Sequence, residues 1–345
     1  MATTRVGVIG LGMMGMTHLD AYAKRASSRG GVEVLAVADL DEGRRTGRTR
    51  AGGNIEGQAQ GGFDFTSVRQ YADASELIAD ADVDLVDVCL PTPAHARFAI
   101  AAMEIGKHVL IEKPLARNSA QASDILAAAE RSAGYTMCAM CMRFWPGWTW
   151  LKDTVDTKTF GLVRSATFRR VADHPGGVFY KNGDACGGAI LDLHIHDADF
   201  VQYLFGMPLA VTSRGYAKIT DHIDHVATQY HYAGQDAPAL VTAEGGWSMT
   251  QGFGFKMEYT VNFERATAVF DLAAEQPLTL IREDRPAEPV VLPEGMGYEH
   301  EISYFLDCIA EGRTPQRVTL TSAAESVRLI EAEVQSVDTG QAVQL

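Results

Sequence analysis

The residues from Arg5 to Arg25 constrain the fold of this chain more than any other segment. An apolar strand, "RVGVI", runs directly into "GLGMMG", and a helical pattern from Gly12 to Arg25 follows. Gly10, Gly12 and Gly15 have the G-x-G-x-x-G spacing, whose glycines permit a tight turn, close approach of the backbone to a pyrophosphate, and close helix–strand packing. The helix N-terminus then faces the phosphate groups. The spacing alone is a weak signal, but its place between a strand and a helix predicts a dinucleotide-binding unit.

The chain after this motif continues to alternate apolar strands with helices. We expect strands at 33–38, 84–89, "KHVLIE" and "TMCAMC", and helices at 75–79, 94–105 and 120–132, the last with Ser119 as its N-cap. Such alternation is typical of a parallel sheet with helices on both faces. The sequence therefore predicts an α/β Rossmann domain, parallel and doubly wound, over residues 1–142.

The second predicted strand ends in Asp39, which lies 24 residues after Gly15. A carboxylate at this place accepts hydrogen bonds from the adenosine ribose and repels a 2′-phosphate, so the sequence favours NAD over NADP. Arg44 and Arg45 lie close enough to keep NADP open as an alternative. A second alternative is a Rossmann-like fold without a cofactor, in which Asp39 is only a turn residue.

The rhythm of the sequence changes after about Arg143. Strand patterns with short turns follow one another in "VRSATFRRVA", "HVATQYHY", "FKMEYTVNF" and "ATAVFDL". They predict an α+β domain over residues 143–345 with a large, mostly antiparallel, open sheet. A last helix at 322–337 is expected to close the chain and could pack back on the first domain. Residues 47–62, "GRTRAGGNIEGQAQGG", carry almost no large apolar side chains and are interpreted as a mobile insertion.

Composition limits the function classes open to the chain. A length of 345 residues suggests two domains, and the net charge of −14 argues against binding to nucleic acids or anionic membranes. The N-terminus does not resemble a secretory signal, and the five cysteines, an odd number scattered along the chain, do not resemble a disulfide framework, so a cytoplasmic location is expected. Cys138 and Cys141 have C-x-x-C spacing but lie among methionines, and we interpret them as buried thiols.

The stretch "GGAILDLHIHDADF", from Gly187 to Phe200, places acids and histidines among apolar residues. Such groups form either a paired structural network or a site where charge is used. In a helix, one stripe holds Asp192, His196, Asp199 and Tyr203. His194 and Asp197 point the other way.

A metal site is the alternative interpretation of this stretch. Asp192, His194 and His196 alternate at strand spacing, and "DHIDH" from Asp221 supplies further ligand types. The helical pattern separates His194 from the other two, so the sequence argues against a metal. Asp199 is expected to be a structural acceptor.

Four segments together carry a resemblance to a known family. The strand in "GKHVLIEKPLA" ends at Glu112, Lys113 and Pro114, where ligands bind in open α/β sheets. With "GVIGLGMMG", "PTPAHARFAIAAMEIGKHVLIEKPLA", "CMRFWPGW" and "GGAILDLHIHDADFVQYLFG" in this order, the chain resembles the glucose-fructose oxidoreductase, inositol dehydrogenase and rhizopine-catabolism (Gfo/Idh/MocA) family. The resemblance runs from Arg5 to the final "GQAVQL".

The resemblance implies a catalytic set and a cofactor site. Lys113, Asp192 and His196 match the catalytic positions: His196 would take a hydroxyl proton as hydride leaves for nicotinamide, Lys113 would hydrogen-bond the oxygen, and Asp192 would orient the histidine. The cofactor-binding residues would be Gly10, Gly12, Met13, Met14, Gly15, Asp39, Pro91, His95, Glu112, Lys113 and Arg143. For His95 and Arg143 the sequence leaves open a plain helix-start role and a strand-end salt bridge. Ala94, where the family commonly has asparagine, and the long insertion depart from the family pattern.

The expected activity is that of an NAD-dependent dehydrogenase for a secondary hydroxyl of a sugar, inositol or related polyol. The alternatives are a non-catalytic dinucleotide-binding sensor or regulator and an NAD-dependent glycoside-cleaving enzyme. His174 and Tyr180 are candidate substrate-binding residues, but no motif names the sugar. The one-sided alternation in "FKMEYTVNFERATAVFDL" predicts a homodimer or homotetramer, because family members bury this sheet face between subunits.

Overall fold

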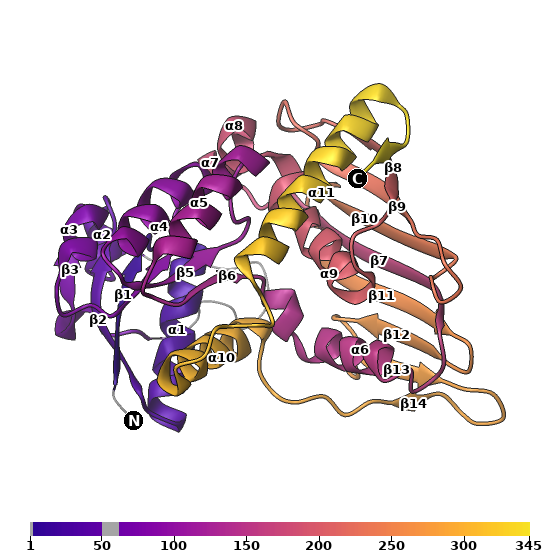
Figure 1. Ribbon diagram of the computed structural model, residues 1–345, viewed down its shortest axis with the longest axis horizontal. Coiled ribbons are helices and arrows are strands. Elements are labelled where there is room, and N and C mark those ends of the chain that lie inside the picture. The colour runs from indigo at the N-terminus through magenta and orange to yellow at the C-terminus, as the bar shows by residue number, and fades with distance from the viewer. Residues whose placement is uncertain (1–2, 50–61) are drawn as a thin grey trace. The chain divides into compact units, whose positions relative to one another are not determined.

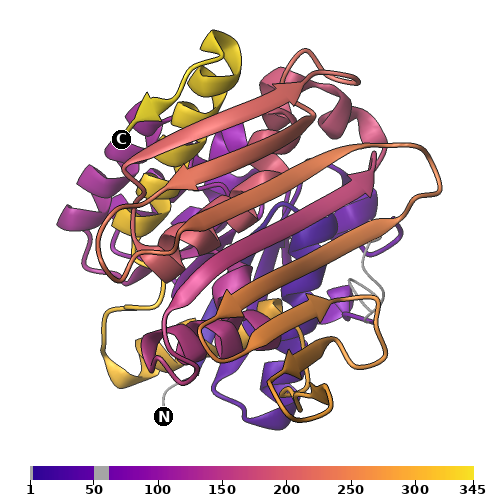
Figure 2. The same ribbon diagram turned by 90° about the vertical axis from the view of Figure 1, so that its right-hand side faces the viewer.

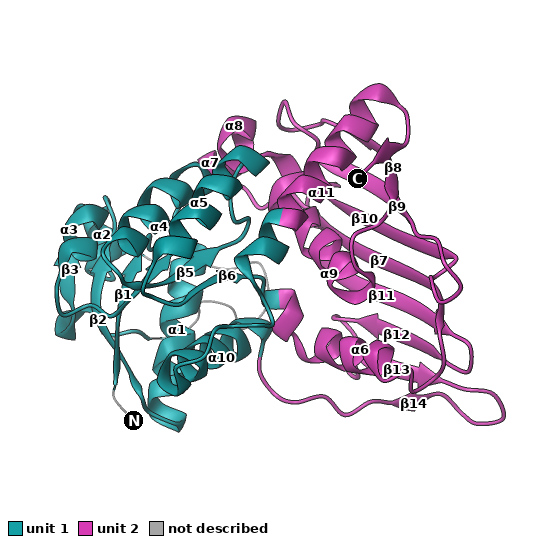
Figure 3. Cartoon of the chain, in the orientation of Figure 1, with its two compact units in different colours: residues 1–141, 296–324 teal, residues 142–295, 325–345 magenta. Residues whose placement is uncertain are grey.

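The computed structural model describes residues 3–49 and 62–345, and the chain divides into two compact units (Figures 1 and 3). The first unit is Met1–Cys141 with Met296–Ala324, and the second is Met142–Gly295 with Glu325–Leu345. A late segment of the chain therefore belongs to the first unit. Most of the predicted insertion, residues 50–61, lies outside the described residues.

A six-stranded parallel sheet forms the centre of the first unit. Its order is β3-β2-β1-β4-β5-β6, so the strand order reverses between β1 and β4. The strands are β1 (Thr4–Ile9), β2 (Val32–Ala38), β3 (Arg69–Tyr71), β4 (Leu85–Val88), β5 (His108–Glu112) and β6 (Thr136–Ala139). Their apolar side chains are buried because helices cover both faces, which confirms the Rossmann prediction.

Helices lie on both faces of this sheet (Figure 1). One face carries α1 (Met13–Ser28) and α10 (Gly297–Glu311), which pack against each other. The other face carries α3 (Ala74–Ala79), α4 (His95–Glu104) and α5 (Ser119–Arg131). The short α2 (Glu42–Arg45) follows β2. α1 and α3 lie on opposite faces because β2 and β4 lie on opposite sides of β1 and both crossover connections are right-handed.

Two local expectations in this unit need correction. Ser119 is the first helical residue of α5 and not its N-cap; the cap is Asn118, whose side chain accepts a hydrogen bond from the Gln121 N–H at 2.9 Å. The strand predicted in "TMCAMC" ends at Ala139, and Cys141–Phe144 forms a 3-10 helix. All five cysteines are free and buried, as expected for Cys138 and Cys141.

The second unit is built on a nine-stranded sheet with the order β14-β13-β12-β11-β7-β10-β9-β8-β15. All its strand pairs are antiparallel except β7 with β10, which is parallel. The strands are β7 (Val163–Asp173), β8 (Ala210–Tyr216), β9 (His225–His231), β10 (Leu240–Met249), β11 (Phe255–Phe263), β12 (Thr267–Asp271), β13 (Leu278–Ile281), β14 (Glu288–Pro289) and β15 (Val343–Gln344). The predicted mostly antiparallel sheet is confirmed.

The two faces of this sheet differ in character. Side chains alternate along β11, where Met257, Tyr259 and Val261 are buried while Thr260 and Asn262 are exposed. Helices α6 (Pro146–Asp156) and α9 (Ile195–Phe205) lie on the buried side, and α9 contacts β7 and β10. No described helix crosses the face turned toward the viewer in Figure 2.

Two 3-10 helices, Phe65–Ser67 and Thr92–Ala94, lie in the first unit. The remaining α- and π-helical segments of the described residues are short, except for the last. They are α7 (Gly177–Lys181), α8 (Gly183–Cys186), a π-helical turn at Ile190–His194, and α11 (Leu320–Thr339). Among the described helices, none combines the length and the apolar character that crossing a bilayer requires.

Candidate active site

The turn between β1 and α1 has the geometry that the three glycines predict. Gly10 has a φ of 90°, and a Cβ on it would lie 2.5 Å from the Cys89 carbonyl oxygen. A Cβ on Gly15 would lie 1.9 Å from the Gly10 carbonyl oxygen, so only glycine permits this packing. At Gly12 no described atom outside residues 11–13 lies within 4 Å of the Cβ position. This open space at the N-terminus of α1 fits the pyrophosphate of a dinucleotide.

Asp39 lies directly after β2 and faces this turn. Its carboxylate accepts hydrogen bonds from the Leu11 N–H at 2.8 Å and from the Asp41 N–H at 2.9 Å. Each oxygen keeps a lone pair with which to accept a ribose hydroxyl. Arg44 places a guanidinium nitrogen 3.6 Å from Asp39, and Arg45 donates to the Asp39 carbonyl at 2.5 Å. Asp39 is thus tied to the glycine-rich loop, and the residues present fit the NAD adenosine.

Lys113 follows the last residue of β5, at the carboxyl edge of the parallel sheet. Its backbone N–H donates to the Glu112 carboxylate at 3.0 Å, and the Lys113–Pro114 peptide bond is cis. His95 is buried, with Nδ1 2.9 Å from the Pro114 carbonyl oxygen and Nε2 2.7 Å from that of Leu90. Burial lowers the pKa of His95, although the two carbonyls oppose this shift. His95 therefore joins the loops that leave β4 and β5.

The stretch from Gly187 to Phe200 is helical, with the π-helical turn at Ile190–His194 ahead of α9. Asp192 and His196 are half-buried, whereas His194 and Asp197 are fully buried on another side. Nε2 of His194 lies 2.8 Å from the Glu333 carboxylate. π-helical turns are frequent at functional sites, so the turn that contains Asp192 makes this segment a candidate functional segment.

Two buried arginines pair with the remaining acids of this stretch. Arg143 donates to Asp199 at 2.9 and 2.7 Å, and Ser326 donates to the same carboxylate at 2.6 Å. Arg170 donates to Asp197 at 2.8 and 3.0 Å. Asp199 is thus a structural acceptor, as expected, and Arg143 is occupied in a buried ion pair.

The candidate substrate residues His174 and Tyr180 lie together. Nε2 of His174 is 3.1 Å from the Tyr180 carbonyl oxygen, and both rings make edge contacts with Trp247. Both side chains are half-buried. Trp247, which the sequence did not single out, is almost fully buried beneath them and holds the pair in place.

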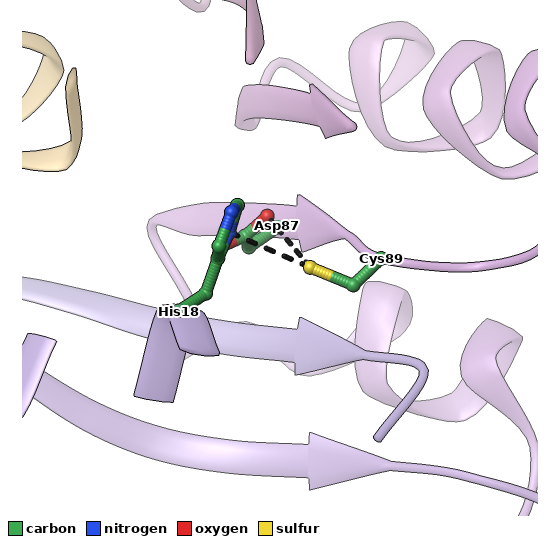
Figure 4. Close-up of side chains that lie close together, drawn as sticks. All are labelled: His18, Asp87 and Cys89. Carbon is green, nitrogen blue, oxygen red and sulfur yellow. Dashed lines mark hydrogen bonds and ion pairs between the residues drawn. The ribbon is translucent and has the colours of Figure 1, made fainter. Parts of the chain in front are cut away.

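The predicted pattern also missed a buried cluster in the first unit around His18 (Figure 4). Nδ1 of His18 lies 2.8 Å from Asp87, and Tyr22 donates to the same carboxylate at 2.9 Å. Cys89 donates to Asp87 at 3.4 Å, and burial raises the pKa of its thiol. The available signal was Asp87 itself, since an acid inside the apolar strand pattern "DLVDVC" requires a partner.

Three groups of described residues bring His, Cys, Asp or Glu ligand atoms within 4.8 Å of one another. They are His18 with Asp87 and Cys89, His18 with Glu112 and Glu301, and the more exposed Asp184 with Asp221 and His222. The set considered from the sequence, Asp192 with His194 and His196, is not among them. Its helical conformation directs His194 toward Glu333 instead.

Comparison with known proteins agrees with this geometry. Residues 4–139 match the profile described as "Oxidoreductase family, NAD-binding Rossmann fold", and residues 148–269 match the "GFO/IDH/MocA C-terminal domain". Inositol 2-dehydrogenase 2 of Saccharopolyspora erythraea is 28% identical over 98% of this chain and 94% of its own length. Myo-inositol 2-dehydrogenase of Thermotoga maritima is 31% identical over 59% of this chain and 55% of its own length.

Solved structures share the fold across the whole chain. Levoglucosan dehydrogenase in complex with NADH and levoglucosan superposes with a TM-score of 0.84, at 21% identity and 99% coverage of both chains. An NAD binding oxidoreductase from Klebsiella pneumoniae gives a TM-score of 0.83 at 21% identity, with 99% coverage of both chains. The two matched profiles, the glycine-rich turn and the paired sheets lead to one conclusion: the chain belongs to the Gfo/Idh/MocA family of oxidoreductases, with an NAD-binding Rossmann fold.

Proposed function

We propose that this protein is an NAD-dependent dehydrogenase that oxidises a secondary hydroxyl of a sugar, inositol or related polyol. The observation that carries the proposal is the place of Lys113, at the carboxyl edge of a parallel sheet whose β1–α1 turn and Asp39 fit a dinucleotide. The relatives named as inositol dehydrogenases and the neighbour named as levoglucosan dehydrogenase support the substrate class.

In the proposed reaction each catalytic side chain acts on the hydroxyl that is oxidised. The imidazole of His196 takes the hydroxyl proton, and Asp192 orients the ring. The ammonium of Lys113 donates a hydrogen bond to the same oxygen and stabilises the negative charge that develops there. Bound NAD supplies the hydride acceptor.

The cofactor is held by the residues around the carboxyl ends of β1, β2, β4 and β5. The turn at Gly10, Gly12 and Gly15, with Met13 and Met14 in the first turn of α1, faces the pyrophosphate. Asp39 would accept hydrogen bonds from the ribose hydroxyls. Pro91, His95 and Glu112 form the wall that follows β4 and β5, and Arg143 stays a predicted cofactor contact.

The test is a panel of polyols and sugars, with NADH formation followed by absorbance. Lys113→Ala and His196→Ala should each lower kcat by about 10²-fold or more, the scale of a general acid–base group, with little change in NAD affinity. Asp192→Asn should also slow turnover. Unimpaired kcat in both alanine variants would overturn the proposed mechanism.

Two results of the same panel would point to the alternative functions. NAD binding without turnover of any compound indicates a sensor or regulator. Cleavage of a glycoside without net NADH indicates that NAD is reduced and reoxidised within one turnover.

A further inference from the structure

His18, which the proposed reaction does not use, contacts residues of two neighbouring strands of the first unit, β4 and β5. His18 comes from α1, one turn after Gly15, and its side chain is completely buried. Its Nδ1 lies 2.8 Å from Asp87 of β4, and its Nε2 lies 2.9 Å from Glu112 of β5. Figure 4 shows the ring beside Asp87 and Cys89. The ring therefore connects the helix that begins at the glycine-rich turn with the carboxyl ends of both strands.

The contact with Glu112 continues directly to Lys113. One oxygen of the Glu112 carboxylate faces His18, and the other accepts the backbone N–H of Lys113 at 3.0 Å. On the far side of the lysine, His95 lies 2.9 Å from the Pro114 carbonyl oxygen. Lys113 thus lies between Glu112, which contacts the buried His18, and Pro114, whose carbonyl oxygen contacts the buried His95.

The charges around His18 favour a protonated ring, which forms ion pairs by distance with Asp87 through Nδ1 and with Glu112 through Nε2. Burial alone would lower the pKa of His18, but the negative charge of Asp87 raises it well above its usual value. Glu301 of α10 is completely buried, and a carboxyl oxygen of it lies within 4.8 Å of the ligand atoms of His18 and Glu112. Burial raises the pKa of Glu301 well above its usual value, which favours the neutral form of this third acid.

Two further titratable groups, the Tyr22 hydroxyl and the Cys89 thiol, also contact the Asp87 carboxylate. Tyr22 donates to Asp87 at 2.9 Å, and burial raises the pKa of its hydroxyl. Cys89 contacts both His18 and Asp87, and burial likewise keeps its thiol protonated. An imidazolium at this place has a carboxylate within ion-pair distance of each ring nitrogen, Asp87 at Nδ1 and Glu112 at Nε2.

We propose that His18 is a positioning residue, which acts through Glu112 to fix Lys113 relative to the helix that faces the cofactor. The inference rests on the proposed catalytic role of Lys113. Its physical basis is that the Glu112 carboxylate can hold the lysine backbone in one place only if its own position is fixed.

Two substitutions of the same histidine separate this role from a general contribution to stability. In His18→Gln the terminal amide nitrogen replaces Nε2 and can still donate to Glu112, whereas in His18→Asn it replaces Nδ1 and can donate only to Asp87. We expect His18→Asn to lower kcat by about 10-fold to 10²-fold, the range that follows from misplacing a catalytic group. His18→Gln should stay within about threefold of the wild type, and NAD affinity should change little in either variant.

Amide hydrogen exchange of the full-length protein gives a readout that needs no substrate. The peptide that contains Lys113 should exchange faster in His18→Asn and in Glu112→Gln, because one carboxamide cannot accept from both His18 and the Lys113 N–H. The same peptide should be protected in His18→Gln. Tyr22→Phe is the matched control: it removes a donor to Asp87 but none to Glu112, so it should lower Tm while leaving this exchange and kcat unchanged.

A double-mutant cycle with Lys113→Ala decides between the two proposals. If His18 acts through the lysine, adding His18→Asn to Lys113→Ala should cause no further loss of kcat. A full additional loss, or unchanged kcat and exchange in His18→Asn alone, overturns the positioning role. If Lys113→Ala itself keeps kcat, the proposed catalytic role of Lys113 fails, a result distinct from both. Glu112→Gln replaces His18→Asn in the cycle if the latter does not fold.

Discussion

At the scale of single residues, Asp39 joins cofactor choice to the shape of the glycine-rich loop. Its carboxylate would accept the ribose hydroxyls while it already accepts the Leu11 N–H. Asp39→Ser should weaken NAD binding and relatively improve NADP, because it removes an acceptor and a negative charge that repels a 2′-phosphate. The measurement is kcat/KM with each cofactor. A wild-type preference for NADP would contradict this assignment and make Arg44 or Arg45 the determinant.

The buried pair of His194 and Glu333 predicts a pH-dependent stability. Burial would lower the pKa of His194, but the charge of Glu333 raises it above its usual value. The folded protein then holds this proton to a higher pH than the unfolded chain, whose histidines titrate near about pH 6.5. The stability from this pair is fully present below about pH 6.5 and is lost as pH rises through the folded pKa.

His194→Gln should therefore lower the free energy of unfolding most at low pH, by about 3 kcal/mol near pH 6, the scale for breaking a buried pair. The difference from the wild type should shrink as pH rises. Urea unfolding over a pH series measures it, with His222→Gln at a more exposed position as the control. A difference that grows with pH would contradict the prediction.

Residue roles were predictable where a local pattern decides them. The helical period placed His194 and Asp197 away from His196, and His194 contacts Glu333 in the structure. The separate expectation that Asp199 is a structural acceptor is also confirmed. The His18 cluster was not predictable, because its members come from positions 18, 87, 112 and 301. No local periodicity encodes a contact between residues that far apart.

At the scale of elements, the β1–α1 turn offers a matched pair of substitutions. Gly15→Ala should lower Tm and abolish NAD binding, since its methyl would lie 1.9 Å from the Gly10 carbonyl oxygen. Gly12→Ala should leave Tm within a few degrees, because nothing described outside residues 11–13 lies within 4 Å and its φ of −72° suits alanine. NAD should still bind Gly12→Ala more weakly, by about 10-fold or more, if the pyrophosphate fills that space.

Calorimetry on both variants, with NAD titrations, checks this pair. Unchanged NAD affinity in Gly12→Ala would place the pyrophosphate elsewhere.

Element prediction worked where side-chain periodicity and turn residues dominate. The parallel strands around the glycine-rich turn and the alternation along β11 were correctly expected. The π-helical turn at Ile190–His194 and the 3-10 helix at Cys141–Phe144 were not, because both depend on packing rather than on composition. The parallel pairing of β7 with β10 likewise joins strands far apart in the chain.

At the scale of the whole molecule, the uncovered sheet face in Figure 2 predicts self-association. Thr242, Thr167 and Thr260 lie in register across β10, β7 and β11, and they form a row of small side chains on that face. We expect a homodimer or homotetramer in light scattering. Thr167→Arg should shift the protein toward monomers, because a charge buried in an interface without a partner is costly. A monomeric wild type would contradict the prediction.

The chain returns to its first unit only late, since α10 packs on α1 and brings Glu301 beside His18. On the ribosome, the first 141 residues therefore emerge without the helix that covers α1. At ordinary translation rates of about 5 to 20 residues per second, roughly 10 to 30 seconds pass between the synthesis of residue 141 and that of α10. During this interval the face of α1 that α10 covers stays exposed. A gene fragment that ends after β6 therefore encodes an incomplete cofactor domain.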